Sequence, residues 1–159
     1  MSTKKIGQYS MSLLLLVSSL WAVSTCAITL NVTESLSNRL FFLKKANDFQ
    51  VGDTVFFQPE FSSVPFVKII AGTFGDRITV HNQKFYINDI YQGDVIADIR
   101  AIQSQSIPKD YYFVKGEHPR SLDSRYEQVG LVHKSELQYK GFALDGVLDV
   151  LLGKHWGFK

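Results

Sequence analysis

A long uncharged segment near the N-terminus constrains this chain more than any other feature. No Asp, Glu, Lys or Arg occurs between Lys5 and Glu34, and residues 11–30 read MSLLLLVSSLWAVSTCAITL. In a helix that rises about 1.5 Å per residue, these mostly apolar residues are long enough to cross the ~30 Å hydrocarbon core of a bilayer. Lys4 and Lys5 precede the segment, and the positive-inside rule places them in the cytoplasm. We therefore predict a cytoplasmic tip and one N-terminal transmembrane helix within residues 1–30, with the rest of the chain across the membrane.

A cleaved signal peptide is the alternative interpretation of this segment. The apolar core SLLLLVSSLWAV has a suitable length, and the small residues of STCA would permit cleavage after Ala27. A lipid anchor on Cys26 is disfavoured, because Thr25 is a poor neighbour for a lipidated cysteine. An anchor and a signal peptide would deliver the same domain to the same compartment.

Composition excludes several classes of protein. The chain has 159 residues, which suits one domain of ordinary size plus an appendage. It is 45% hydrophobic and 20% charged, which excludes a disordered chain, and its net charge of +2 without a Lys/Arg run predicts no nucleic-acid partner. Cys26 is the single cysteine and the four histidines lack metal-ligand spacing, so we predict no internal disulfide, metal or other cofactor.

From residue 39 onward, short runs of β-branched and aromatic residues alternate with Gly, Asp and Pro. This pattern is typical of short strands joined by tight turns, and it predicts a mainly β domain built as a compact antiparallel sheet or barrel. The runs are RLFFLKK (39–45), VGDTVFFQP (51–59), VPFVKIIAG (64–72), the hairpin DRITVHNQKFYIND (76–89), YYFVKG (111–116) and EQVGLVHK (127–134).

A clear helical pattern in the soluble part occurs only near the C-terminus, in ALDGVLDVLLGKHWG. The apolar residues that recur there at helical spacing are Leu144, Val147, Leu148, Leu151 and Leu152. We predict that the tail, residues 145–159, is an amphipathic helix that lies on the domain or on the membrane surface. This leaves residues 31–144 as the folded domain.

Lys68, in VPFVKIIAG, lies in an apolar strand. With a period of two, Phe66 and Ile70 share its face, and Val67 and Ile69 lie on the other. Loss of water around a lysine lowers its pKa, which is how a lysine becomes a general base near neutral pH. A lysine that reaches water from a strand edge is the alternative.

A neutral lysine is useful beside a hydroxyl that it can deprotonate, and Ser–Lys pairs are a known nucleophile–base arrangement. Ser35 and Ser37, in NVTESLSNRLFFL, are the candidate nucleophiles, and an ordinary polar collar is the alternative. A second polar cluster, SLDSR at 121–125, interrupts two predicted strands. Taken by itself, this cluster is typical of a polar turn.

Four phrases of the sequence, in their order, resemble peptidase family S26, the type I signal peptidases. The family has a Ser phrase after its anchor, a Gly-Asp turn, a Lys strand that ends near Gly-Asp, and a stretch that ends in Ser-x-Asp-Ser-Arg-Tyr. The corresponding phrases here are ESLSNRLFFL, VGDTVFF, FVKIIAGTFGDRITV and GEHPRSLDSRY. VHKSELQYKGFAL is similar to the family's last strand, so the likeness covers about residues 31–144. The closer resemblance is to the TraF-type peptidases of conjugative transfer.

The resemblance implies a fold of the signal-peptidase type and roles for three residues in the reaction. Ser35 matches the nucleophile and Lys68 the general base. Thr33 lies where the family places a hydroxyl that helps the Ser35 backbone N–H form the oxyanion hole. The implied protein is a serine endopeptidase with a Ser–Lys dyad. It would cleave signal or leader peptides from exported precursors, which in the TraF-type case include prepilins.

The same resemblance gives the SLDSR cluster a role around the catalytic lysine. Ser121 matches a serine that hydrogen-bonds and orients the lysine, and Asp123 and Arg125 match a structural ion pair. The implied location is the bacterial inner (plasma) membrane, with a single-pass anchor in the lipid bilayer. The catalytic domain would then lie on the periplasmic or extracytoplasmic side.

The chain also departs from the family pattern near the expected site. Ser37 stands where the family has a proline, and His118 and Pro119, in GEHPR, replace part of a Gly-Asp-Asn-Arg phrase. These departures and the small domain fit a specialised enzyme. Two alternatives are a catalytically inactive assembly protein of the same fold, in a pilus or secretion system, and a Ser–His hydrolase that uses His81 or His118.

Overall fold

The computed structural model of the protein describes residues 26–31, 35–96 and 99–147. Within these ranges the chain forms short strands, one 3-10 helix, η1 (Lys134–Glu136), and a helical stretch at residues 145–147. The strands are β1 (Cys26–Leu30), β2 (Leu40–Lys45), β3 (Thr54–Phe57), β4 (Phe66–Gly72), β5 (Arg77–His81), β6 (Lys84–Ile87), β7 (Ile90–Asp94), β8 (Gln105–Ser106), β9 (Tyr111–Lys115), β10 (Val132–His133) and β11 (Tyr139–Ala143).

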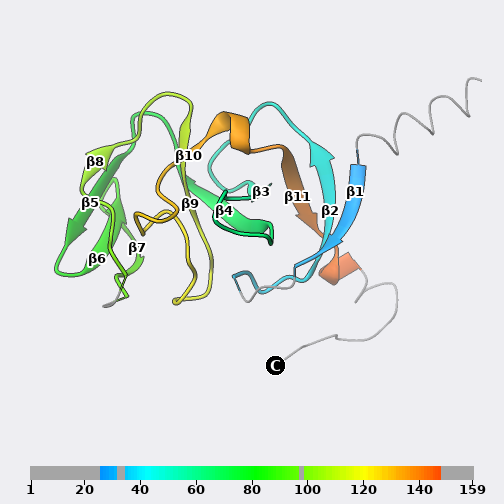
Figure 1. Cartoon of the computed structure of the whole chain (residues 1–159), viewed down its shortest axis with the longest axis horizontal. Helices are drawn as coiled ribbons and strands as arrows, with labels where there is room; N and C mark the ends of the chain where they lie inside the picture. Colours follow the sequence, from blue (N-terminus) through cyan, green and yellow to red (C-terminus); the bar gives the residue numbers. More distant parts are fainter. Residues whose placement is uncertain (1–25, 32–34, 97–98, 148–159) are drawn as a thin grey trace, which may run out of the picture.

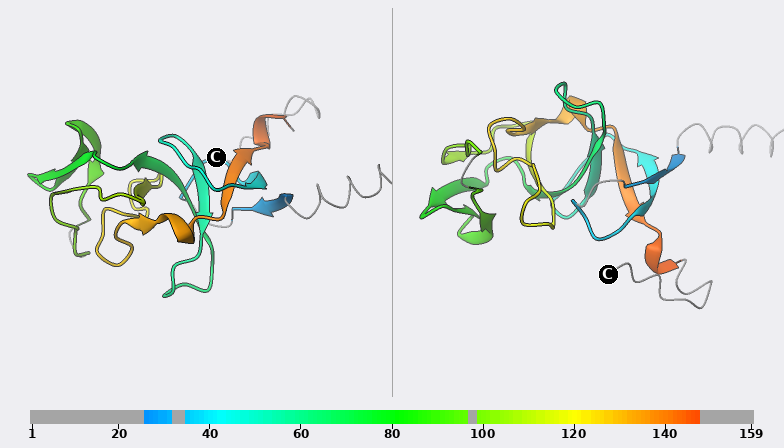
Figure 2. Two further views of the ribbon diagram at one scale, coloured as in Figure 1. Left: turned by 90° about the horizontal axis from the view of Figure 1, so that it is seen from above. Right: turned by 60° about the horizontal axis from the view of Figure 1, so that its bottom comes forward.

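These strands form two antiparallel sheets that lie side by side along the molecule (Figure 1). The larger sheet has seven strands in the order β1-β2-β11-β3-β4-β9-β10, and the smaller has four in the order β7-β6-β5-β8. The larger sheet curls around its own interior, as the rotated views show (Figure 2). The prediction of a mainly β, antiparallel domain is therefore confirmed.

The last strand in the sequence lies in the middle of the larger sheet. β11 pairs with β2 on one side and with β3 on the other, so two strands that follow each other in sequence are separated in space. Phe42 of β2 lies opposite Phe142 of β11. Gly141 permits the close approach of these strands, because a Cβ there would overlap the Phe56 ring and lie 3.3 Å from the Phe41 ring.

β1 changes the predicted boundary of the N-terminal apolar segment. Residues 26–30 belong to the predicted transmembrane helix, but they form an extended strand that pairs with β2 from Cys26↔Lys44 to Leu30↔Leu40. A short apolar run suits a strand as well as a helix, and the backbone groups of β2 favour the strand here. Residues 1–25, which hold the rest of that prediction, lie outside the described residues. In the part of the chain that the structure describes, no helix is long and apolar enough to span a membrane.

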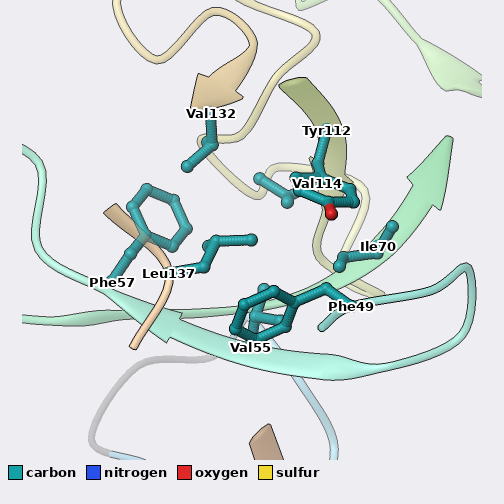
Figure 3. Close-up of a cluster of buried hydrophobic side chains, with 8 residues drawn as sticks. All are labelled: Phe49, Val55, Phe57, Ile70, Tyr112, Val114, Val132 and Leu137. Atoms are coloured by element: carbon teal, nitrogen blue, oxygen red, sulfur yellow. The ribbon is translucent and has the colours of Figure 1, made fainter. Parts of the chain in front are cut away.

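Buried side chains from the strands and loops of the larger sheet form a core in its interior (Figure 3). They are Phe49, Val55, Phe57, Ile70, Tyr112, Val114, Val132 and Leu137. A second core lies between β9 and the smaller sheet. Its members are Ile78, Phe85, Ile87, Ile102, Ile107 and Phe113. β9 contributes to both cores, because successive side chains of a strand point to opposite faces. Packing on both faces fixes the end of β9, where the segment that carries Ser121 begins.

Three parts of the chain differ from the predicted strands and helix. The run EQVGLVHK forms a strand only at β10, because Gly130 takes a φ of +62° and its N–H closes a turn on the Tyr126 carbonyl. β7 and β8 were not predicted, and both are short strands with mostly exposed or half-buried side chains. In the C-terminal tail, residues 145–147 are helical, and residues 148–159 lie outside the described residues.

Candidate active site

Lys68 lies in an inner strand of the larger sheet. It lies in β4 between β3 and β9, opposite Val55, and only 2% of its surface is exposed. As the period of two predicts, Ile70 packs in the interior core, whereas Val67 packs in a separate cluster with residues of β2 and β3. Both faces of this strand are therefore apolar, and the Lys68 amine has little access to water.

Two hydroxyl groups lie next to the Lys68 amine. Nζ is 2.6 Å from Ser35 Oγ and 2.9 Å from Ser121 Oγ. Ser35 belongs to the segment before β2, and Ser121 belongs to the segment after β9. The structure thus brings together the three residues to which the family resemblance assigns the nucleophile, the base and the orienting serine.

Burial lowers the pKa of Lys68 from its ordinary value of 10.5 to about 8, because the charged ammonium loses hydration inside the sheet. The Asp123 carboxylate raises this pKa and the Arg125 guanidinium lowers it, both by less than burial does. The Phe66 ring, whose centroid is 5.0 Å from Nζ, also favours the ammonium. Burial has the largest effect on the pKa of Lys68, so a substantial fraction of its amine is neutral in weakly alkaline solution.

A buried ion pair organises the SLDSR segment. Arg125 Nε lies 2.8 Å from Asp123 Oδ1, and a terminal guanidinium nitrogen donates to Asp123 Oδ2 at 2.9 Å. The exposed fractions of the two side chains are 0% for Asp123 and 3% for Arg125. Removal of one member of such a pair leaves a buried charge uncompensated, at a cost of about 3–5 kcal/mol.

The ion pair also fixes the backbone on both sides of the site. Asp123 Oδ2 accepts the N–H of Gly116 at 2.9 Å, and the Arg125 guanidinium donates to the carbonyl of Ser121 at 3.1 Å. These two contacts hold Gly116 and Ser121 close together. A Cβ on Gly116 would overlap Ser121 Oγ and would lie 2.9 Å from the Ser35 carbonyl oxygen. Position 116 therefore has room only for glycine.

Ser35 opens onto a pocket of about 450 Å³. The residues that line the pocket are Ser35, His118, Arg120, Ser121 and Leu122. Among the described contacts, the partner of Ser35 Oγ is Lys68 rather than a histidine. His118 Nδ1 instead accepts the N–H of Arg120 at 3.1 Å, and His81 ends β5 in the smaller sheet. These contacts give a Ser–His hydrolase no support.

Ser37 and Thr33 are the remaining residues predicted for the reaction. Ser37, the other candidate nucleophile, donates through both its N–H and its Oγ to Glu117 Oε2, at 2.9 and 2.8 Å. Thr33 lies outside the described residues, so its part in an oxyanion hole stays a prediction. Within the described ranges, no group of three or more His, Cys, Asp or Glu side chains is placed to hold a metal ion.

Three residues with contacts at the site were given no role by the sequence analysis. Ser124 binds β9 through two hydrogen bonds, since its Oγ accepts the Val114 N–H and its own N–H donates to the Val114 carbonyl, each at 3.0 Å. Gly116 and Ser124 lie within the phrases GEHPR and SLDSR, which were already of interest. Glu117 also lies within GEHPR, but nothing in the sequence linked it to its partner Ser37, which is 80 residues away.

Comparisons with known proteins show what the chain is similar to. The family model described as "Signal peptidase, peptidase S26" matches residues 4–143. Signal peptidase I P of Bacillus subtilis subsp. natto is 31% identical over 121 residues, or 64% of this chain. The match spans 63% of that relative, so the chain corresponds to somewhat less than two thirds of its length. The crystal structure of a signal peptidase I from Enterococcus faecalis is 22% identical, with a TM-score of 0.40, over 57% of this chain and 93% of that chain.

Proposed function

The chain belongs to the signal peptidase family, peptidase S26, and we propose that it is a serine endopeptidase with Ser35 as nucleophile and Lys68 as general base. The observation that carries this proposal is the distance of 2.6 Å between Lys68 Nζ and Ser35 Oγ. At this distance a neutral amine can accept the hydroxyl proton directly. The apolar surroundings of Lys68 supply the neutral amine, because they disfavour its charged form.

The proposed reaction has two halves, and Lys68 moves the proton in each. Ser35 Oγ attacks the carbonyl carbon of the scissile peptide bond while Lys68 Nζ takes the hydroxyl proton. Negative charge develops on the carbonyl oxygen, for which the Ser35 N–H and the Thr33 hydroxyl are the proposed donors. The Lys68 ammonium then gives its proton to the leaving amine as the C–N bond breaks. Neutral Lys68 next deprotonates a water molecule, which attacks the acyl carbon. As the acyl C–O bond breaks, the Lys68 ammonium returns the proton to Ser35 Oγ and the acyl group leaves as a carboxylic acid.

The neighbouring polar residues act through Lys68 rather than on the substrate. Ser121 orients the amine through its contact of 2.9 Å. Asp123 and Arg125 form the buried ion pair that holds the segment carrying Ser121. These roles are part of the proposal, and the hydrogen bonds are the observations that support them.

The proposed substrates are exported precursor proteins, which lose a signal or leader peptide. Family membership supports this class of substrate, and the uncharged N-terminal segment supports a single-pass anchor in the bacterial inner membrane with the catalytic domain outside the cytoplasm. The resemblance to TraF-type peptidases supports maturation of prepilins in conjugative transfer. An inactive assembly protein of the same fold is less well supported, because Ser35, Lys68 and Ser121 are all present and in contact.

The pH dependence of cleavage tests the proposed function. We expect kcat/KM to rise with pH through about 8, because the neutral form of Lys68 is the active one and burial lowers its pKa to about 8. At pH 7 only about a tenth of the lysine would be neutral. The measurement is the initial rate at which the detergent-solubilised full chain cleaves an exported precursor from acid to alkaline pH. A rate that falls as the pH rises contradicts a lysine base, and no cleavage at any pH favours the inactive assembly protein.

Gly116→Ala should damage the site by crowding. The new methyl group would displace Ser121 Oγ, the Ser35 carbonyl, or both, and a displacement of about 1 Å near the chemistry costs roughly a hundredfold in kcat. Overpacking of this kind also lowers the free energy of unfolding, by about 1–3 kcal/mol. Precursor cleavage and urea denaturation measure the two effects. The matched control is Gly146→Ala, where a Cβ meets nothing within 4 Å, and equal losses in both variants would contradict the crowding.

A further inference from the structure

The segment that carries the nucleophile is held by a residue that has no part in the reaction described above. The N–H of Glu117 donates to the Ser35 carbonyl at 2.7 Å, and its Oε2 accepts both the N–H and the Oγ of Ser37, at 2.9 and 2.8 Å. The N–H of His118 adds a longer bond to the Ser35 carbonyl, at 3.3 Å. Of these four described hydrogen bonds between the two segments, Glu117 makes three.

We propose that Glu117 is a positioning residue for Ser35, an inference that rests on the function proposed above. Leu36, between the two serines, is 6% exposed and packs in a hydrophobic cluster beneath the segment. The segment is thus fixed at three successive residues, through the carbonyl of Ser35, the side chain of Leu36, and the N–H and hydroxyl of Ser37. A backbone held in this way has little freedom to rotate, which keeps Ser35 Oγ within reach of the Lys68 amine.

A carboxylate suits this position better than a neutral side chain would. Hydrogen bonds to a charged acceptor are the stronger kind, and one oxygen of Glu117 receives both donors of Ser37. Ser37 and Glu117 are both exposed, so water competes for these bonds and they add little to the stability of the whole domain. A peptide bound over Ser35 would exclude that water and strengthen them. Loss of the carboxylate should therefore affect catalysis much more than folding.

The kinetic test compares Glu117→Ala, Glu117→Gln and the control Glu136→Ala in the purified full chain. Glu136 is matched because it is also an exposed carboxylate that accepts a backbone N–H, that of His133 at 2.9 Å. We expect Glu117→Ala to lower kcat roughly ten- to a hundredfold with little change in KM, since the misplaced group is the nucleophile. Glu117→Gln keeps an acceptor oxygen but loses the charge, so it should recover part of the lost kcat and remain slower than the parent. Glu136→Ala should cleave as fast as the parent.

Amide hydrogen exchange gives a second readout that needs no activity. Glu117→Ala should speed exchange of the Ser37 amide by roughly tenfold, and Glu136→Ala should leave it unchanged. If the parent is active, the inference requires both the loss of kcat and the faster exchange, and either change without the other overturns it. If the parent enzyme cleaves no better than Ser35→Ala, the proposed function fails. In that case, unchanged exchange in Glu117→Ala also overturns the inference, and faster exchange supports Glu117 as the residue that holds the segment.

Discussion

Ser35→Ala is expected to abolish precursor cleavage, with kcat lowered by roughly 10⁴-fold or more. The substitution removes the oxygen that we propose attacks the peptide bond, and Lys68 then has no hydroxyl to deprotonate at that position. Ser35 is half-buried and loses only its hydroxyl, so the variant should fold and unfold like the parent. The measurement is the initial rate of precursor cleavage, together with the thermal unfolding of the same preparation.

Ser37→Ala is the matched control for this experiment. It removes a neighbouring hydroxyl whose partner is Glu117 rather than Lys68, and it leaves the Ser37 N–H bond to Glu117 in place. We expect kcat to decrease only a few fold, because the variant loses a single hydrogen bond. The assignment of the nucleophile would be wrong by two residues if Ser37→Ala were inactive and Ser35→Ala retained cleavage.

Lys68→Arg is expected to be as inactive as Lys68→Ala, with a loss of roughly 10²- to 10⁴-fold in each. A guanidinium keeps the positive charge but stays protonated at any usable pH, so it cannot accept the Ser35 proton. A role for Lys68 as a fixed charge predicts the opposite, namely that arginine would preserve activity. Initial cleavage rates of the two variants over neutral and alkaline pH distinguish these roles.

Ser121→Ala provides the comparison for the lysine variants. It removes one of the two hydroxyl contacts of the Lys68 amine but leaves the base itself, so its loss of activity should be smaller than that of Lys68→Arg. Lys68→His should keep at most a trace of activity, because a histidine can act as a base only where it reaches Ser35. Substantial cleavage by Lys68→Arg would remove Lys68 from the mechanism, and attention would return to His118, which lines the same pocket.

Local patterns in the sequence predicted most of the strands and the character of Lys68. The runs of β-branched and aromatic residues correspond to β2 to β6 and β9, because these strands pack against cores and so carry apolar side chains. The alternation around Lys68 predicted which neighbours share its face, and Ile70 and Val67 do pack in different clusters. Alternation works here because it is a local geometric property of any extended chain.

Contacts between distant segments could not be predicted in this way. Lys68 is 33 residues from Ser35 and 53 from Ser121, and only the family resemblance suggested that the three belong together. No pattern linked Ser37 to Glu117, because two exposed polar residues on different loops carry no periodic signal. β1 was missed for another reason: its apolar side chains continue a segment long enough to suggest a membrane helix, and only pairing with β2 distinguishes the strand.

The position of β11 determines when during synthesis the larger sheet can be completed. Until Tyr139–Ala143 has left the ribosome and paired, β2 and β3 have no common neighbour, and the sheet that carries Lys68 stays open between them. Pairs such as Phe42 and Phe142 join the early and late parts of the chain, and contacts of such long range form slowly. The larger sheet of a nascent chain therefore stays incomplete until Ala143 has been made.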